Sequence, residues 1–303
     1  MNHRSDVIKA HLALLGANLF YGACFTVAKL VMPRLIAPEA FILIRVVCTC
    51  LLFWLSFMGG AAFRTKFEKK DWRRLVLGGM FGVAINQLFF FKGLNLTQPI
   101  HASLIMLSTP ILITFIAAFI LRERITAVKL AGLILGVGGA VFLIAQKAAG
   151  NGGTNVALGD FMVFLNAASY AGYLVLIKPL MAKYRPVIVI RWVFLFGALI
   201  VLPFGWSDFA AIEWQRFAWT DYLAVGFIVV CCTFCTYLWN TYALRKLSAS
   251  TAGAYIYLQP LFAAIIAVLF YGETLTWQKL VSALFIFAGV YLVTKPAAAV
   301  KPD

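Results

Sequence analysis

The sequence predicts an all-α integral membrane protein, in which ten transmembrane helices form two inverted five-helix repeats around a central cavity. Three observations support this fold class. Hydrophobic residues make up 63% of the 303 residues and charged residues only 12%, about half the charged share of an ordinary soluble domain. Apolar runs recur along the whole chain, and its second half resembles the first at a fixed spacing. A soluble fold of this length cannot bury so much apolar surface.

Apolar runs long enough to cross a bilayer predict the individual helices. A spanning helix needs about 20 residues, because each residue advances about 1.5 Å through roughly 30 Å of hydrocarbon. Little chain is left between the runs, so we expect no separate soluble domain. The first run is too long for a cleavable signal peptide. The ten runs lie near residues 10–31, 38–59, 73–91, 99–121, 127–146, 158–180, 187–205, 220–243, 250–270 and 276–294.

Loop charges predict the orientation of these helices. The chain has 26 Lys and Arg residues against 11 Asp and Glu residues. With the N-terminus in the cytoplasm, most of the basic residues fall in cytoplasmic loops, including the dense run Arg64–Arg74. This distribution follows the positive-inside rule. We therefore expect both termini in the cytoplasm and a multi-pass protein in a cell membrane, which for a bacterium is the inner membrane. The positive charge needs no nucleic-acid partner.

The two halves of the chain carry matching residues 150 positions apart. Each copy would hold five spans, an odd number, so the second copy must be inverted in the membrane. We therefore expect a first repeat at residues 1–147 and a second, inverted repeat at residues 148–303. Inverted repeats are typical of secondary transporters, which bind substrate where the repeats meet. The matches that chance explains least well are Pro110/Pro260, Glu123/Glu273, Thr126/Thr276 and Lys129/Lys279.

These features resemble the EamA-type members of the drug/metabolite transporter superfamily. The family pattern is a span that runs from alanine through proline to Glu-x-x-Thr. Lys29 near the end of the first span and Arg45 in the second also look like this family. The resemblance implies a ten-helix carrier, often an exporter of amino acids or other small metabolites, but members differ widely in substrate. The pattern occurs twice, as Ala102…Pro110…Glu123–Thr126 and as Ala252…Pro260…Glu273–Thr276.

Polar and aromatic side chains recur at helical spacing within several spans. An intramembrane polar residue is costly, so it is a candidate functional residue. Positions i, i+3, i+4 and i+7 share one helix face. Hydrogen bonding between helices would produce the same pattern. As a set, however, these faces predict the lining of one wet, aromatic cavity: Asn18, Tyr21, Asn86, Gln87, Phe90, Asn166, Tyr170, Tyr173, Tyr237, Asn240, Tyr255 and Gln259.

Two cations and two prolines are further candidates. Arg45 lies well inside a span and Lys29 near a span end. Either could bind a substrate carboxylate or phosphate, although snorkelling and capping of carbonyl groups are alternatives. Pro110 and Pro260 are expected to kink their helices, either as gate hinges or as fixed bends. No Asp or Glu lies at the centre of a span, which favours a facilitator or exchanger over a proton-coupled pump.

The sequence lacks the residue patterns expected of an enzyme or a metalloprotein. The six cysteines lie in apolar runs without a nearby His or carboxylate, so we expect neither a zinc site nor a disulfide. The spans hold no clustered carboxylates and no nucleophile paired with a base. We therefore expect no catalytic residues, no metal and no cofactor.

The sequence thus predicts a secondary transporter, either an exporter or an exchanger, that works by alternating access. The expected cavity contains no carboxylate, which favours neutral or zwitterionic metabolites such as amino acids. A multidrug exporter of lipophilic cations is the alternative, and a membrane-embedded enzyme or a channel is less favoured. The expected partners are a small-molecule substrate and membrane lipid, and the protein acts as a monomer or a homodimer.

Overall fold

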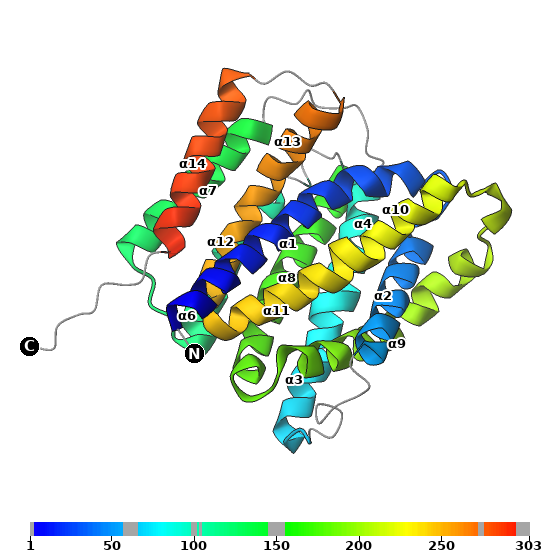
Figure 1. Cartoon of the computed structure of the whole chain (residues 1–303), viewed down its shortest axis with the longest axis horizontal. Helices are drawn as coiled ribbons and strands as arrows, with labels where there is room; N and C mark the ends of the chain where they lie inside the picture. The colour runs from blue at the N-terminus through cyan, green and yellow to red at the C-terminus, as the bar shows by residue number, and fades with distance from the viewer. Residues whose placement is uncertain are drawn as a thin grey trace, which may run out of the picture.

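A computed structural model describes residues 3–56, 66–97, 102, 105–144, 155–271 and 276–294, and within these ranges every regular element is a helix. Figure 1 shows long helices packed side by side. Seven of them are long and apolar enough to cross a membrane, and three shorter apolar helices lie at Thr109–Leu121, Ala127–Phe142 and Leu280–Thr294. The chain is therefore a multi-pass, all-α membrane protein.

The order of elements recurs along the chain. A π-helix, η2, joins α3 to α4, and a second π-helix, η4, joins α10 to α11 at bounds shifted by 150 residues. The first half contains α1 His3–Val31, α2 Pro38–Leu55, α3 Lys69–Gly79, η2 Met80–Ile85, α4 Asn86–Leu96, α6 Thr109–Leu121 and α7 Ala127–Ile144. The second contains α8 Val156–Lys183, α9 Pro186–Ala210, η3 Trp214–Arg216, α10 Trp219–Val229, η4 Val230–Cys235, α11 Thr236–Lys246, α12 Ala249–Ala254, η5 Tyr255–Tyr257, α13 Leu258–Tyr271 and α14 Trp277–Thr294.

Local sequence explains where several helices begin. Pro38 and Pro186 are the first residues of α2 and α9, where a missing N–H costs little. The side-chain oxygens of Asn155 and Ser248 accept main-chain N–H groups in the first turns of α8 and α12, as N-caps do. Each cap satisfies a donor that the helix itself leaves unpaired.

The two prolines expected to kink their helices instead lie at helix starts. Pro110 is the second residue of α6. Pro260 is the third residue of α13, which directly follows the 3-10 turn η5. At both places the proline stands in the first turn of a helix, which tolerates the missing N–H and the fixed φ of proline.

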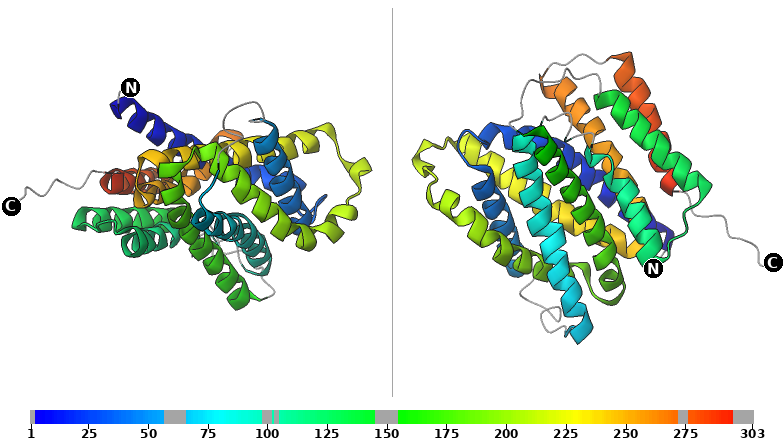
Figure 2. Two further views of the ribbon diagram at one scale, coloured as in Figure 1. Left: turned by 90° about the horizontal axis from the view of Figure 1, so that it is seen from below. Right: turned by 180° about the vertical axis from the view of Figure 1, so that it is seen from behind.

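Helix contacts cross between the two halves of the chain. α4 packs against α8, and α11 packs against α1; α2 packs against α9, and α7 against α14. Figures 1 and 2 show α7 and α14 lying side by side in each view. The α7–α14 contact is close because glycines face each other there. A Cβ on Gly289 would lie 2.5 Å from the Gly136 nitrogen and 2.7 Å from the Gly132 carbonyl oxygen, so the backbones nearly touch.

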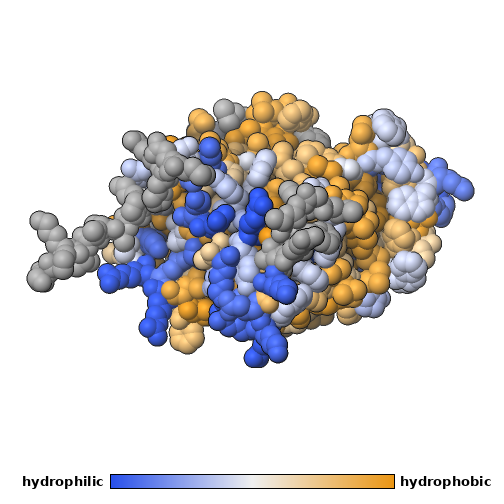
Figure 3. Space-filling model, turned by 60° about the horizontal axis from the view of Figure 1, so that its bottom comes forward, coloured by the Kyte–Doolittle hydropathy of each residue, from blue (hydrophilic) through white to orange (hydrophobic). Residues whose placement is uncertain are grey.

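Polar side chains gather at one end of the bundle. Figure 3 shows a hydrophilic face over the end at the bottom of Figure 1, flanked by hydrophobic surface. At this end the fully buried Asp71 carboxylate accepts from the Tyr184 hydroxyl and forms an ion pair with Lys183. Asp221, 150 residues later, forms an ion pair with Arg34 at 2.9 Å. These two contacts fasten the ends of α8 and α1 to the starts of α3 and α10.

We expect Gly289→Ala to destabilise the protein by about 1–3 kcal/mol, because the new methyl group meets backbone atoms that cannot move aside. Gly138→Ala is the matched control, since it lies in α7 and its Cβ would meet nothing within 4 Å. That change should be neutral or stabilise the helix by up to about 1 kcal/mol. Thermal unfolding of the purified variants in one detergent compares them, and equal unfolding temperatures would contradict the close α7–α14 contact.

Candidate functional site

A cavity of about 320 Å³ lies between the helices in the middle of the bundle, close to the smallest volumes of ligand sites. Its walls come from α1, α2, α4, α8 and α11, together with the starts of α6 and α13. The wall continues to the end of α1 and the start of α2, at Met32, Pro33 and Pro38. The cavity thus extends from mid-depth toward the end of the bundle opposite the N-terminus.

Eight of the twelve residues expected from the sequence line this cavity. They come from five separate stretches of chain, so the structure does bring the polar faces of distant spans together. Asn86 and Gln87 are the first two residues of α4, directly after the π-helix η2. The eight are Tyr21, Asn86, Gln87, Phe90, Asn166, Tyr170, Tyr237 and Gln259, and Arg45 joins them.

The other four residues lie one helical turn closer to the N-terminal end of the bundle. Asn18 precedes Tyr21 in α1, and Tyr173 follows Tyr170 in α8. Asn240 follows Tyr237 in α11, and Tyr255 precedes Gln259 ahead of α13. Given the direction of each helix, all four steps lead the same way. These four side chains are between 1% and 8% exposed, so they form the packed floor beneath the cavity rather than its wall.

Specific contacts hold this floor together. The Asn240 side-chain amide donates to the Thr236 carbonyl oxygen, 2.8 Å away, within α11. Asn18 accepts from the Gln259 amide at 2.9 Å, which links α1 to α13. The Tyr255 hydroxyl lies 2.8 Å from the His11 ring nitrogen Nδ1. Asn18 and Tyr255 are thus paired with other segments, whereas Asn240 bonds within its own helix and the buried Tyr173 hydroxyl has no hydrogen-bond partner among the described residues.

Several lining residues carry no polar signal and were missed in the sequence. Cys24, Ala28, Phe91, Leu94, Met106 and Ile256 make the upper wall mostly apolar. Thr109 also lines the cavity, and its neighbour Pro110 was the only sign of a special position there. Helical spacing could have predicted one part of this wall. Gln87, Phe90, Phe91 and Leu94 share one face of α4, so extending the polar face of Gln87 along the helix would have included Phe91 and Leu94.

Arg45 is the charged side chain among the residues described in the cavity wall. It is 7% exposed, and its Nε donates to the Thr233 hydroxyl oxygen at 3.2 Å. The guanidinium carbon lies 5.7 Å from the Phe41 ring centre and 5.9 Å from that of Phe91, within the range of cation–π attraction. The Lys29 side chain, the other expected anion contact, lies outside the described residues.

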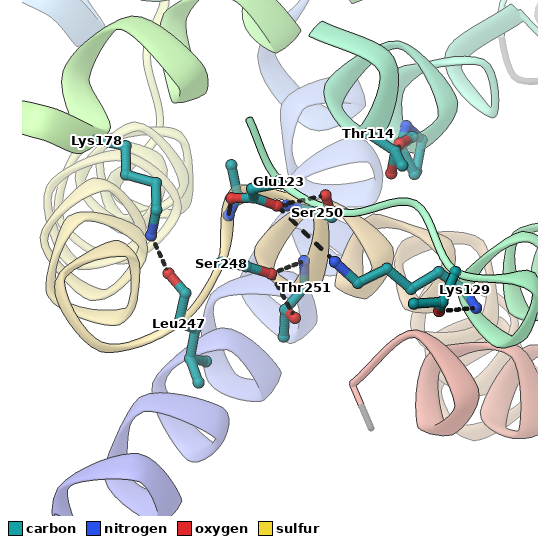
Figure 4. A network of polar contacts seen from close by, with 11 residues as sticks. Thr114, Glu123, Lys129, Lys178, Leu247, Ser248, Ser250 and Thr251 are labelled. Carbon is teal, nitrogen blue, oxygen red and sulfur yellow. Dashed lines mark hydrogen bonds and ion pairs between the residues drawn. The ribbon is translucent and has the colours of Figure 1, made fainter. Parts of the chain in front are cut away.

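A polar network closes the N-terminal end of the bundle (Figure 4). The Glu123 carboxylate accepts from the Ala249 N–H at 2.9 Å and from the Ser250 hydroxyl at 2.7 Å. It thereby joins the chain after α6 to the first turn of α12. Lys178 on α8 donates to the Leu247 carbonyl oxygen beside it. These contacts lie beyond the packed floor, so described side chains cover the cavity at this end.

The described residues show no arrangement suited to metal chemistry. Within the ranges given above, no group of three or more His, Cys, Asp or Glu side chains could hold a metal ion. The wall instead consists of aromatic rings, amides, one guanidinium and aliphatic groups. Such a surface can bind and release a small solute, covering its apolar part and replacing its lost water.

Comparisons with known proteins identify the family to which this chain belongs. The model of the EamA-like transporter family matches residues 8–145 and again residues 157–295. The chain belongs to the EamA-like transporter family. It is therefore a transporter and not an enzyme, as the sequence predicted, and it falls within the drug/metabolite transporter superfamily.

Similar proteins are known from several organisms. An uncharacterized transporter of Archaeoglobus fulgidus is 25% identical over 94% of this chain and 97% of its own length. A probable terminal-alkyne amino-acid exporter of Streptantibioticus cattleyicolor is 26% identical over 75% of this chain and 74% of its own. A solved crystal structure has the same fold, with a TM-score of 0.75 at 19% identity, covering 94% of this chain and 96% of the other.

We expect single cysteines at the cavity wall to react faster than those in its floor. In a background without native cysteines, Asn86→Cys and Gln259→Cys should react readily with a small water-soluble thiol reagent, because both side chains line the cavity. Asn240→Cys and Tyr173→Cys should react several-fold more slowly, and the outward-facing Leu284→Cys gives the rate for a side chain in detergent or lipid. Equal rates at Gln259 and Asn240 would contradict a cavity that ends above the floor.

Proposed function

We propose that this EamA family member is a secondary transporter that exports or exchanges small neutral or zwitterionic metabolites such as amino acids by alternating access. The observation that carries the proposal is a cavity of amides, phenols and one cation that opens toward one end of the bundle and is closed at the other. A transporter caught with its site accessible from one side has this form.

The chemistry of the wall supports the substrate class. Amides from Asn86, Gln87 and Gln259 and hydroxyls from Tyr21 and Tyr170 can replace the water that a polar solute loses. The small volume favours a small metabolite. A lipophilic cation would find aromatic rings but, among the described lining residues, no carboxylate, and it would face the charge of Arg45. A multidrug-cation exporter therefore remains the second candidate.

The packed floor and the Glu123 network support alternating access. The residues one turn below the cavity continue the same polar faces toward the N-terminal end. In a state open at that end, Asn18, Tyr173, Asn240 and Tyr255 would become the accessible part of the path. The same helix faces would then line the substrate path in both states. Between the two states, the accessible stretch of each face would shift by about one helical turn.

The repeated element bounds support ten spans in two inverted halves, residues 1–147 and 148–303. Seven helices meet the length of a span, and the three shorter apolar helices would complete ten. A shift of 150 residues relates α4 to α11 and α1 to α8. The contact of α4 with α8 therefore corresponds to the contact of α11 with α1, as expected from a pseudo-twofold axis in the membrane plane. Under the positive-inside rule the hydrophilic N-terminal face of Figure 3 is cytoplasmic, and the cavity opens away from the cytoplasm. The membrane would be a bacterial inner membrane.

The similarity to an amino-acid exporter agrees with this direction and substrate class. We expect the purified protein in proteoliposomes to exchange labelled apolar amino acids and to ignore a lipophilic cation. Asn166→Leu should lower the transport rate, because it removes an amide from the wall and leaves a carbonyl group without its donor. Lipid-facing Leu199→Ala is the control. Movement of the cation alone would favour the drug exporter instead.

We expect Glu123→Gln to loosen the closed end. The neutral amide loses the ion pair with Lys129 and the strength of charge-assisted bonds to Ala249 and Ser250, and a loss of about 1.4 kcal/mol shifts the open population roughly tenfold. The measurement is the labelling rate of Asn240→Cys, which should rise in the Glu123→Gln background. Glu213→Gln, at an exposed ion pair with Arg216, should leave the rate unchanged. An unchanged rate in both backgrounds would remove Glu123 from the gate.

A further inference from the structure

Arg45 is a buried cation that no described carboxylate neutralises. It lies in α2 with 7% of its surface exposed, and it forms no ion pair with any described residue. A guanidinium carries five N–H donors. The Nε–H is used by Thr233, and the faces of Phe41 and Phe91 lie beside the group. The two terminal nitrogens form no hydrogen bond with a described residue, and Arg45 lines the cavity, so the planar fork that suits a carboxylate is unused.

Buried oxygens without donors lie elsewhere on the same wall. Among the described residues, both the oxygen and the nitrogen of the Gln87 amide, the side-chain carbonyl oxygen of Asn166 and the hydroxyl of Thr109 have no hydrogen-bond partner. The three residues are 4%, 2% and 0% exposed, and all three line the cavity. Leaving such groups unpaired costs free energy, so their presence at a cavity indicates a polar ligand, and the Asn166 oxygen in particular calls for a donor.

The orientation of one of these groups is fixed by its other contact. The Asn166 side-chain nitrogen donates to the main-chain carbonyl oxygen of Asn86. Because a carbonyl can only accept, the nitrogen must point that way, and the oxygen of the same amide is left as an acceptor. Asn166 therefore offers an acceptor and cannot be exchanged for a donor by rotating the amide.

We propose that the cavity binds the two charged ends of an α-amino acid separately, and that Arg45 determines specificity by holding the carboxylate. The side-chain oxygens of Gln87 and Asn166 accept from the substrate ammonium group. The apolar side chain then lies along Phe90, Leu94 and Met106 toward the open end. This assignment rests on the function proposed above and adds which group recognises which end of the substrate.

The test compares leucine with relatives that lack one end. The probes are L-leucine, 3-methylbutylamine, which lacks the carboxylate, and 4-methylpentanoate, which lacks the ammonium group. Each competes with labelled leucine for binding to the purified full chain. Wild-type protein should bind leucine about 10- to 100-fold more tightly than either relative, as expected for the loss of charge-assisted hydrogen bonds.

Two variants divide the preference between the two ends. Arg45→Gln should abolish the preference for leucine over 3-methylbutylamine and keep the preference over 4-methylpentanoate. Gln87→Met, of similar length, should weaken the preference over 4-methylpentanoate, because only the Asn166 oxygen then remains, and should keep the preference over 3-methylbutylamine. Arg191→Lys is the control, because Arg191 is a buried arginine outside the cavity wall that lies over Trp54, and it should change neither preference.

Each result has a distinct meaning. If wild-type protein neither binds nor transports leucine, methionine or phenylalanine, the proposed function fails. If it transports them and Arg45→Gln keeps the full preference over the amine, the proposed function stands and the role of Arg45 is refuted. Should Arg45→Gln not fold, leucinamide and leucine methyl ester replace it as probes on the wild-type protein. Both keep the ammonium group and lose the carboxylate charge, and binding equal to leucine would also refute the assignment.

Discussion

In a membrane interior no water is available to pair with a free main-chain carbonyl, and this constraint organises the centre of the bundle. A π-helix widens the backbone and shifts its hydrogen bonds, and η2 and η4 place such turns at equivalent points of the two halves. Side chains from other helices donate there: Tyr237 of α11 to the Gly82 carbonyl oxygen and Ser169 of α8 to that of Phe81. The same bonds that satisfy the backbone hold α8 and α11 against η2, where the cavity lies.

The sequence predicted the helix faces but not the depth of the cavity. Helical periodicity states which side of a helix a residue occupies, and the polar stripes did converge: Tyr21, Tyr170 and Tyr237 share one wall. Periodicity carries no information on how far a cavity extends along the axis. Asn240 and Tyr173 lie on the predicted faces yet pack one turn below, because that depth is filled by other side chains in this state. The difference therefore reflects conformation as much as sequence.

Other features escaped the sequence for local reasons. A proline inside an apolar run is compatible with a kink or with a new helix start, and nothing near Pro110 or Pro260 distinguishes the two. The π-helices leave no mark either, since Met80–Ile85 and Val230–Cys235 read as ordinary apolar turns. The small residues Gly132, Gly136 and Ala140 recur every four positions in α7, which indicates a close helix contact but does not identify the partner helix. Gly289 of α14 carries no signal apart from lying 150 residues after Gly139.

Closure at the Glu123 end sets an energetic condition on the proposed cycle. Charge-assisted bonds contribute about 1.5–3 kcal/mol each, so opening this end costs several kcal/mol unless other contacts form. Both states of a transporter must stay within a few kcal/mol of each other to interconvert under substrate control. The sequence retains a glutamate at the equivalent position, Glu273, while Arg122 and Arg124 are replaced there by Gly272 and Thr274. The loss of both arginines at the second position is the change that the positive-inside rule favours for a copy of opposite orientation.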